Sequence, residues 1–157
     1  MFALVRGVTY ATVFIGLVLV FVPARILSAS GIVAPAMTGT LQVAGMIVTA
    51  SGAALAVWCV LAFAIVGKGT PAPFDPPRQL VIRGPYGRVR NPMYIGAGLA
   101  LAGVGFYFES VQVFGYTAAF FVITHLFVVL YEEPTLKRMF GDEYDEYRKS
   151  VRRWWPK

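Results

Sequence analysis

The sequence predicts an all-α, polytopic integral membrane protein, and three observations carry that prediction. Of the 157 residues, 57% are hydrophobic and only 14% are charged, and the mean hydropathy is +0.65. Soluble domains carry about 25% charged residues. The apolar residues are gathered into four runs that approach or exceed the roughly 20 residues of a transmembrane helix. We expect these runs to form one membrane domain over residues 1–157.

The four apolar runs are the expected transmembrane helices. They cover about residues 8–27, 38–66, 93–108 and 111–131. The second run is long enough to tilt or to project beyond the lipid. Only Glu109 and Ser110 separate the third run from the fourth, so these two helices should form a tight antiparallel hairpin. The first run could instead be a signal peptide that ends at ILSAS, but it is long for that role.

The basic residues predict how the helices are oriented. Five of the 14 Lys and Arg residues lie in the loop 67–92, and seven lie between Lys137 and Lys157. Arg6 precedes the first run, which leaves only Arg25 for the opposite side. The positive-inside rule therefore places both termini and the loop in the cytoplasm. The net charge of +6 should attract anionic lipid headgroups. No nucleic acid partner is expected, because no basic surface lies on a soluble module.

The loop 67–92 is expected to be rigid and irregular. It holds six of the ten prolines, and proline removes a backbone donor and fixes φ, which excludes a helix or a central strand. Asn91 should cap the third helix, with Pro92 in its first turn. The amides of that turn, together with Arg88 and Arg90, suit a carboxylate or a phosphate. Either arginine could instead be an interfacial anchor.

Glycines and the single cysteine have structural interpretations. Gly96, Gly98, Gly103 and Gly105 should allow close helix packing, within one chain or between chains. They do not form a dinucleotide fingerprint, because no strand precedes them and their spacing differs from GxGxxG. Cys59 falls inside the second run, so we expect a buried apolar side chain and neither a disulfide framework nor a metal cluster.

Ionisable residues gather at the end of the fourth run, THLFVVLYEEP. His125 and Glu132 are seven residues apart, almost two helical turns, so they should share a face. Ionisable groups at that depth are functional candidates. Glu133 precedes Pro134, which should end the helix. Two structural alternatives remain: the glutamates could pair with a loop arginine such as Arg90, and a neighbouring group could satisfy the imidazole of His125.

The segment after Pro134 is expected to form an amphipathic helix on the membrane surface. Apolar residues recur there at steps of three and four, with charged residues between them. They are Leu136, Met139, Phe140, Tyr144, Tyr147 and Val151. Gly141 should divide the helix in two, and Trp154 and Trp155 have the headgroup preference of interfacial aromatic residues.

Two segments taken together resemble a known superfamily. GPYGRVRNPMYIG is followed about 35 residues later by YEEPTLKRMFGDEYDEYRKSVRRWWP. This order is similar to that of the isoprenylcysteine carboxyl methyltransferases and the related phospholipid methyltransferases, whose pattern ends with a late Arg and Pro. These are integral membrane enzymes that use S-adenosylmethionine. The resemblance covers roughly residues 80–156 and implies that this half of the chain binds the cofactor.

The resemblance also implies which residues bind the cofactor. The matching residues are Gly84, Pro85, Tyr86, Arg90, Asn91, Pro92, Tyr94, Gly96, Glu132, Glu133, Tyr144 and Tyr147. Asn91 stands where better-known members have His; it can bond a cofactor carboxylate or ribose but cannot titrate near neutral pH. The expected catalytic residues are His125, Tyr94 and Glu133, of which His125 and Tyr94 should lie near the acceptor. No metal site is expected.

The expected function is methyl transfer from S-adenosylmethionine to a lipid or a small hydrophobic acceptor. Alignment of nucleophile, methyl group and sulfur supplies much of such catalysis. A thiolate or a carboxylate needs no protein base, whereas a protonated amine must first lose its proton. The cofactor should come from the cytoplasm and the amphiphilic acceptor from the bilayer. Three alternatives stay open: a phospholipid N-methyltransferase, a nicotinamide-dependent membrane reductase of similar C-terminal architecture, and a non-catalytic membrane scaffold.

Overall fold

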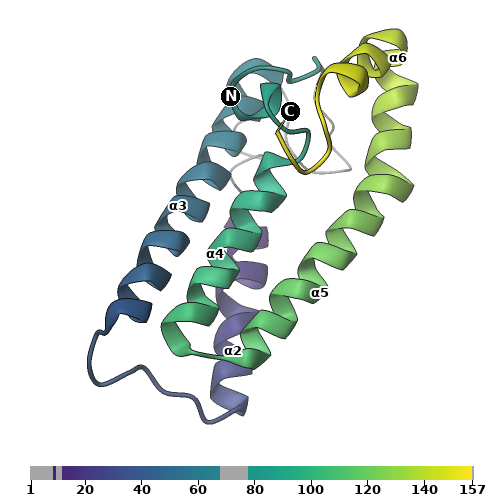
Figure 1. The fold of residues 1–157 in the computed structure, drawn as a ribbon. Helices are drawn as coiled ribbons and strands as arrows, with labels where there is room; N and C mark the ends of the chain where they lie inside the picture. The colour runs from purple at the N-terminus through teal and green to yellow at the C-terminus, as the bar shows by residue number, and fades with distance from the viewer. Residues whose placement is uncertain (1–8, 10–11, 68–77, 157) are drawn as a thin grey trace.

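Long helices lie side by side in the computed structural model, which describes residues 9, 12–67 and 78–156 (Figure 1). In chain order the helical elements are η1 (Ile15–Phe21), α2 (Val22–Ala29), α3 (Thr40–Ala62), η2 (Phe63–Gly67), η3 (Gly84–Gly87), α4 (Pro92–Phe108), α5 (Val111–Phe127), η4 (Val128–Glu132) and α6 (Glu133–Ser150). The elements η1, η2 and η4 are π-helical, and η3 is a single 3-10 turn. The all-α prediction is confirmed for the described residues.

Within the described residues, three continuous helices are long and apolar enough to cross a membrane. They are Thr12–Ala29, Thr40–Gly67 and Val111–Ser150. The third predicted run is the 17-residue helix α4, which at 1.5 Å per residue is about 25 Å long and thus shorter than a hydrocarbon core of about 30 Å. All four runs are therefore helical, and three of them reach spanning length. The predicted start at residue 8 lies outside the described residues.

The helix of the fourth run continues through Pro134, although the sequence indicated that it would end there. Glu133 has α-helical backbone angles, with φ −62° and ψ −44°. The turn before it, η4, is π-helical, and the Glu133 amide donates to the carbonyl of Val128, five residues earlier. Pro134 thus falls in the first turn of α6, where its missing amide costs little. The apolar composition still ends at Tyr131, and charged residues fill α6.

The predicted hairpin between α4 and α5 is confirmed. Glu109 adopts the left-handed conformation with φ 50°, which reverses the chain. Ser110 then caps α5, because its hydroxyl accepts a hydrogen bond from the Val113 amide at 3.2 Å. The Glu109 carboxylate also accepts a hydrogen bond of 2.7 Å from the buried amide of Gln42. This bond ties the start of α3 to the hairpin turn, and we call this end of the molecule the hairpin end.

Glycines allow α3 and α4 to pack closely in antiparallel directions (Figure 1). A Cβ atom at Gly52 would lie 2.5 Å from the Gly96 carbonyl oxygen and 2.5 Å from the Ala100 amide nitrogen. Seven residues away on each helix, Gly45 and Gly103 make a second close approach of the same kind. The prediction of glycine-mediated helix packing is confirmed, and the packing lies within one chain.

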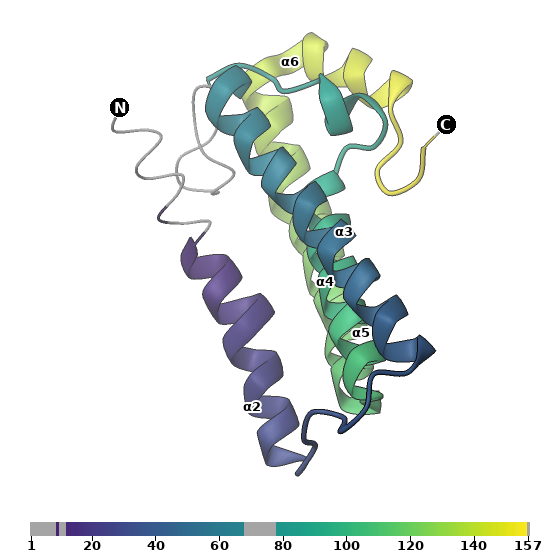
Figure 2. The ribbon, with the colours of Figure 1, turned by 90° about the vertical axis from the view of Figure 1, so that its left-hand side faces the viewer.

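The opposite end of the molecule is closed by α6, the loop residues 78–91 and the last residues of the chain (Figures 1 and 2). We call it the α6 end. The described part of the loop is irregular apart from η3, as predicted, whereas Pro71, Pro73, Pro76 and Pro77 lie outside the described residues. Cys59 is fully buried and packs against Val81 and Tyr86 of the loop, which confirms its structural interpretation.

Two features of the remaining helices complete the fold. The helix α6 is kinked at Gly141, where φ is 51° and ψ is −123°, as the sequence predicted. Its inner face buries Tyr144 and Tyr147 together with Val151. The first helix, η1 followed by α2, stands away from α3 (Figure 2) and contacts α5, where the Tyr116 hydroxyl donates to the Val18 carbonyl at 3.0 Å.

Candidate functional site

A small cavity lies at the α6 end, where four helical elements meet. Its volume is about 20 Å³, which is room for roughly one water molecule. The residues that line it are Phe63, Tyr86, Arg90, Asn91, Met93, Tyr94 and Glu132. They come from η2, η3, the connection between η3 and α4, the start of α4, and η4, so side chains far apart in sequence converge there. Five of these seven residues belong to the set that the superfamily resemblance implies.

Tyr94 and Glu132 form a hydrogen-bonded pair in the cavity wall. The Tyr94 hydroxyl donates to Glu132 Oε2 at 3.1 Å. Glu132 lies just beyond the apolar run that ends at Tyr131. Burial raises the pKa of its carboxyl group to about 7, and the bond from Tyr94 opposes that rise only in part. Although its side chain is partly exposed, the exposed part faces a cavity of one-water size, so desolvation dominates. A carboxyl group of this pKa can exchange a proton near neutral pH.

Glu133, the next residue, lies at the centre of an arginine cluster. Arg153 donates two hydrogen bonds to its carboxylate, from Nε to Oε1 at 2.7 Å and from Nη2 to Oε2 at 3.0 Å. Arg90 Nη1 lies 2.9 Å from the same Oε1, and Arg148 is 3.9 Å from Oε2. Burial disfavours ionisation of Glu133, but the arginines outweigh it and lower the pKa of the carboxyl group. The structural alternative of pairing with a loop arginine is therefore realised for Glu133.

Arg90 connects the arginine cluster to the cavity. Its side chain is only 10% exposed, and Nη1 also lies 3.5 Å from the Tyr144 hydroxyl oxygen. Its Nε is buried and has no hydrogen-bond partner among the described residues. An unpaired buried donor of a charged group costs more than about 1–3 kcal/mol. Native proteins rarely leave such a donor unused, which marks Arg90 as a candidate for ligand contact.

The last residues of the chain form a strap across the site, which we define as residues 151–154. The strap runs parallel to the loop, with a β-bridge between Val89 and Arg152, and the Arg90 amide donates to the Arg152 carbonyl at 2.9 Å. Asn91 stands at the N-cap position of α4 but makes no capping hydrogen bond. Its side-chain amide donates instead to the Arg153 carbonyl at 3.2 Å, because the strap occupies the space beside it.

Tyr147 supplies a further link between α6 and the loop. Its buried hydroxyl donates to the Tyr86 carbonyl at 2.6 Å, and its ring packs in one cluster with Tyr144 and Val151. Neither Tyr144 nor Tyr147 lines the cavity. Both residues predicted to bind the cofactor therefore lie behind the cavity wall, where they hold the loop and the arginine cluster in place.

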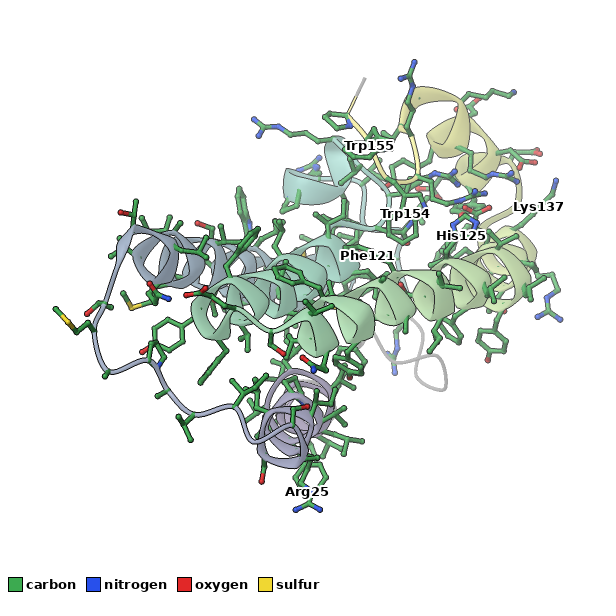
Figure 3. The ribbon with its side chains drawn as sticks, turned by 60° about the horizontal axis from the view of Figure 1, so that its bottom comes forward. Arg25, Phe121, His125, Lys137, Trp154 and Trp155 are labelled. Carbon is green, nitrogen blue, oxygen red and sulfur yellow. The ribbon has the colours of Figure 1, made fainter. Side chains whose placement is uncertain are left out.

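His125 is not among the residues that line the cavity. It is exposed, and its Nδ1 accepts a hydrogen bond of 3.0 Å from Trp154 Nε1. Figure 3 shows the indole ring beside His125 and Phe121. The structure thus gives His125 and Glu132 different neighbours, because the π-helical turn between them holds more residues than an α-helical turn and rotates the residues after it. The neighbouring-group alternative for His125 is realised by Trp154.

The remaining predicted residues shape the backbone around the site. Gly84 has a φ of 63° and begins η3, in which Pro85 is buried. Pro92 opens α4, and Gly96 faces the backbone of α3. Arg88 is exposed. None of these residues lines the cavity.

Sequence reasoning missed Arg153, Arg148 and Phe63. The late Arg of the superfamily pattern was a signal for Arg153, but its partner lies 20 residues away and only the fold brings the two together. In the sequence, Arg148 is one of several charged residues on an amphipathic segment, and Phe63 is one of many apolar residues in a long run. No motif distinguishes either of them.

Comparison with known proteins identifies a family. A family model described as phospholipid methyltransferase matches residues 40–143, which is more than half of the chain. The chain belongs to the phospholipid methyltransferase family. No curated protein and no solved structure matches it. The matched range includes the whole cavity wall and Glu133, but it ends before Tyr144 and the strap.

Family membership and the apolar helices together indicate that the chain is an integral membrane protein of the methyltransferase class. The resemblance found in the sequence is confirmed at the level of the superfamily. Members of the family generally use S-adenosylmethionine. The matched residues do not specify the isoprenylcysteine carboxyl methyltransferase subtype.

The groups around the cavity fit a ligand that carries both an anionic and a cationic group. Arg90 offers a buried unpaired donor, Glu132 offers acceptor oxygens, and Phe63, Tyr86 and Tyr94 supply aromatic surface. S-adenosylmethionine has a carboxylate, an ammonium group, ribose hydroxyls and a purine, so the donor set suits it. Pockets for such ligands measure roughly 300–1,000 Å³. The cavity must therefore widen before it can take the cofactor.

Proposed function

We propose that the protein transfers a methyl group from S-adenosylmethionine to a lipid or another hydrophobic acceptor at the membrane boundary. The observation that carries this proposal is Arg90, whose buried Nε has no hydrogen-bond partner among the described residues and which lines a cavity together with Glu132. The cavity lies at the end of helices long enough to cross a membrane, and the family is one of methyltransferases. When bound, the cofactor supplies an activated methyl group on a sulfonium centre.

Different residues of the cavity would bind different groups of the cofactor. Arg90 would donate to the carboxylate through Nε, which is the strongest type of hydrogen bond available there because both groups are charged. One carboxylate oxygen of Glu132 would accept a hydrogen bond from a ribose hydroxyl, and the side-chain oxygen of Asn91 would accept one from the ammonium group. Tyr86 and Phe63, which pack edge to face with ring centroids 5.2 Å apart, would form an apolar wall.

An amine is the acceptor class that these residues suit best. A protonated amine must lose a proton before it can attack a methyl group. Glu132 has a pKa raised to about 7 by burial, so near neutral pH a large fraction of it is ionised and able to accept that proton at Oε1 or Oε2. Glu133 is less suited, because its carboxylate is held by Arg153 and Arg90. An amine acceptor agrees with a phospholipid N-methyltransferase, which is the second candidate that the family favours.

The distribution of charge supports an orientation in which the α6 end faces the cytoplasm. The described loop arginines and the basic residues of α6 and the strap all lie at this end, whereas Arg25 projects from α2 on the outside of the bundle (Figure 3). Basic residues favour the cytoplasmic side and the anionic lipid of that leaflet. Both termini would then be cytoplasmic, the polar cofactor would come from the cytoplasm, and the acceptor would approach from the bilayer.

Calorimetric titration of the purified protein in detergent tests the cofactor. S-adenosylhomocysteine should bind, whereas NADPH should not. Binding of NADPH alone would favour the reductase alternative, and binding of neither by a folded protein would leave the scaffold alternative. Glu132→Gln and Arg90→Ala should each weaken S-adenosylhomocysteine binding about tenfold or more, as expected for loss of a hydrogen bond to a charged group. Arg138→Ala is the matched control, because Arg138 is exposed and its side chain bonds to Thr135 on the same helix turn.

Methylation of defined acceptors tests the acceptor class. Vesicles that contain phosphatidylethanolamine should accept a labelled methyl group, and vesicles of phosphatidylcholine alone should not. Two further acceptors are tested in parallel. One is a prenylated cysteine with a free carboxylate, and the other is a hydrophobic thiol. Methylation of the carboxylate or of the thiol in place of the amine would overturn the amine assignment but would leave methyl transfer itself in place.

A further inference from the structure

Glu133 and Arg90 form a buried ion pair beside the cavity. If no other group bound Glu133, its carboxylate would compete with a ligand for the donors of Arg90. Their side chains are 9% and 10% exposed, and Arg90 Nη1 lies 2.9 Å from Glu133 Oε1. An isolated Arg–Glu pair favours the bidentate arrangement, in which two donors of the guanidinium bond to two carboxylate oxygens. In that arrangement the charge and the donors of Arg90 would be used by Glu133.

The structure shows that Arg153, not Arg90, holds Glu133 in the bidentate arrangement. Arg153 donates from Nε at 2.7 Å and from Nη2 at 3.0 Å to the two oxygens of Glu133. Arg90 contacts only one of those oxygens and through one nitrogen, so its Nε stays unpaired. With Arg153 in place, the negative charge of Glu133 is already compensated, and Arg90 adds an uncompensated positive charge next to the cavity.

The strap places Arg153 with respect to Arg90 through the backbone. The Arg90 amide donates to the Arg152 carbonyl, and the Asn91 side chain donates to the Arg153 carbonyl. The two arginines therefore approach Glu133 from two adjacent segments that are bonded to each other in register. This arrangement explains why Arg153 reaches the carboxylate although it lies after the end of α6.

We propose that Arg153 is a positioning residue that occupies Glu133 and so keeps Arg90 available for the carboxylate of the bound ligand. The identity of that ligand rests on the proposed function, since the carboxylate is that of S-adenosylmethionine. Arg153 does not line the cavity and acts through Arg90. Without it, Arg90 would turn both donors toward Glu133, and the ligand carboxylate would have to compete with a buried protein carboxylate for the same guanidinium.

Two ligands that differ only in the carboxylate test this proposal. S-adenosylhomocysteine carries the carboxylate, and its decarboxylated analogue, S-adenosyl-3-thiopropylamine, keeps the purine, the ribose and the ammonium group. The affinity of each is measured by calorimetry for the wild-type protein, Arg153→Ala, Arg153→Lys and the exposed control Arg138→Ala. Arg153→Ala should bind S-adenosylhomocysteine about tenfold more weakly and the analogue within about twofold of wild type. Arg153→Lys should fall between, because lysine keeps the charge but lacks the bidentate fork.

Each other outcome has a distinct meaning. Equal weakening of both ligands by a folded Arg153→Ala protein would show a general structural role and overturn the proposal. A wild-type protein that binds both ligands equally well would also overturn it, since Arg90 would not contact the carboxylate, yet methyl transfer would stand. A wild-type protein that binds neither ligand would reject the proposed function itself. If Arg153→Ala does not fold, Arg153→Lys carries the same comparison.

Discussion

The close approach of α3 and α4 predicts a large difference between two glycine-to-alanine substitutions. At Gly52 a Cβ atom would lie 2.5 Å from the Gly96 carbonyl oxygen and from the Ala100 amide nitrogen, whereas at Gly115 of α5 it would meet nothing within 4 Å. Both positions are helical, so both gain about the same intrinsic helix propensity, roughly 1 kcal/mol. Comparison of the two variants therefore isolates the cost of the contact.

The expected difference in stability between the two variants follows from these distances. Ordinary contact begins at 3.4 Å, so the helices must separate by about 0.9 Å at Gly52. A gap of roughly 0.5–1 Å forfeits a quarter to a half of the dispersion energy of the neighbouring contacts, and added methyl groups in packed interiors cost about 1–3 kcal/mol. At about 2–4 °C per kcal/mol for a chain of this size, Gly52→Ala should melt roughly 2–12 °C below Gly115→Ala.

The single cysteine provides the assay. Cys59 is fully buried and lies on α3, so a thiol-reactive fluorophore will report its exposure as the protein unfolds in detergent. Gly115→Ala should melt at or slightly above the wild-type temperature. If Gly52→Ala melts no lower than Gly115→Ala, the backbones of α3 and α4 are not in contact and the glycine-packing argument fails.

Three further predictions concern the hairpin, the loop and the cavity. Ser110→Ala should destabilise the protein by about 1 kcal/mol in the same thermal assay, because the Val113 amide loses its cap. Tyr147→Phe should cost about 1–3 kcal/mol, since the buried carbonyl of Tyr86 loses its donor; unchanged stability would contradict that bond. The rate of amine methylation should rise with pH through about 7, as Glu132 loses its proton, and Glu132→Gln should abolish that ionisation; an unchanged profile would exclude Glu132 as the base.

Much of the fold was predictable because local composition decides it. Four apolar runs became helices, a two-residue connection became a hairpin turn, and Gly141 became a kink. These outcomes depend on chain neighbours and on the bilayer as a solvent. Proline at position 134 was misleading for the same local reason: it normally ends a helix, but here the π-helical turn of η4 accommodates it. Nothing in the sequence signals that turn.

Residue type and order also identified the family and most of the cavity wall, since Tyr86, Arg90, Asn91, Tyr94 and Glu132 were all predicted and all line it. The different environments of Glu132 and Glu133 were not predictable. Adjacent glutamates look equivalent in the sequence, but the helix turns one toward the small buried cavity and the other toward three arginines, and their pKa values move in opposite directions. These partners are separated by 15 or more residues, so only the packing of the strap, the loop and α6 against one another brings them together.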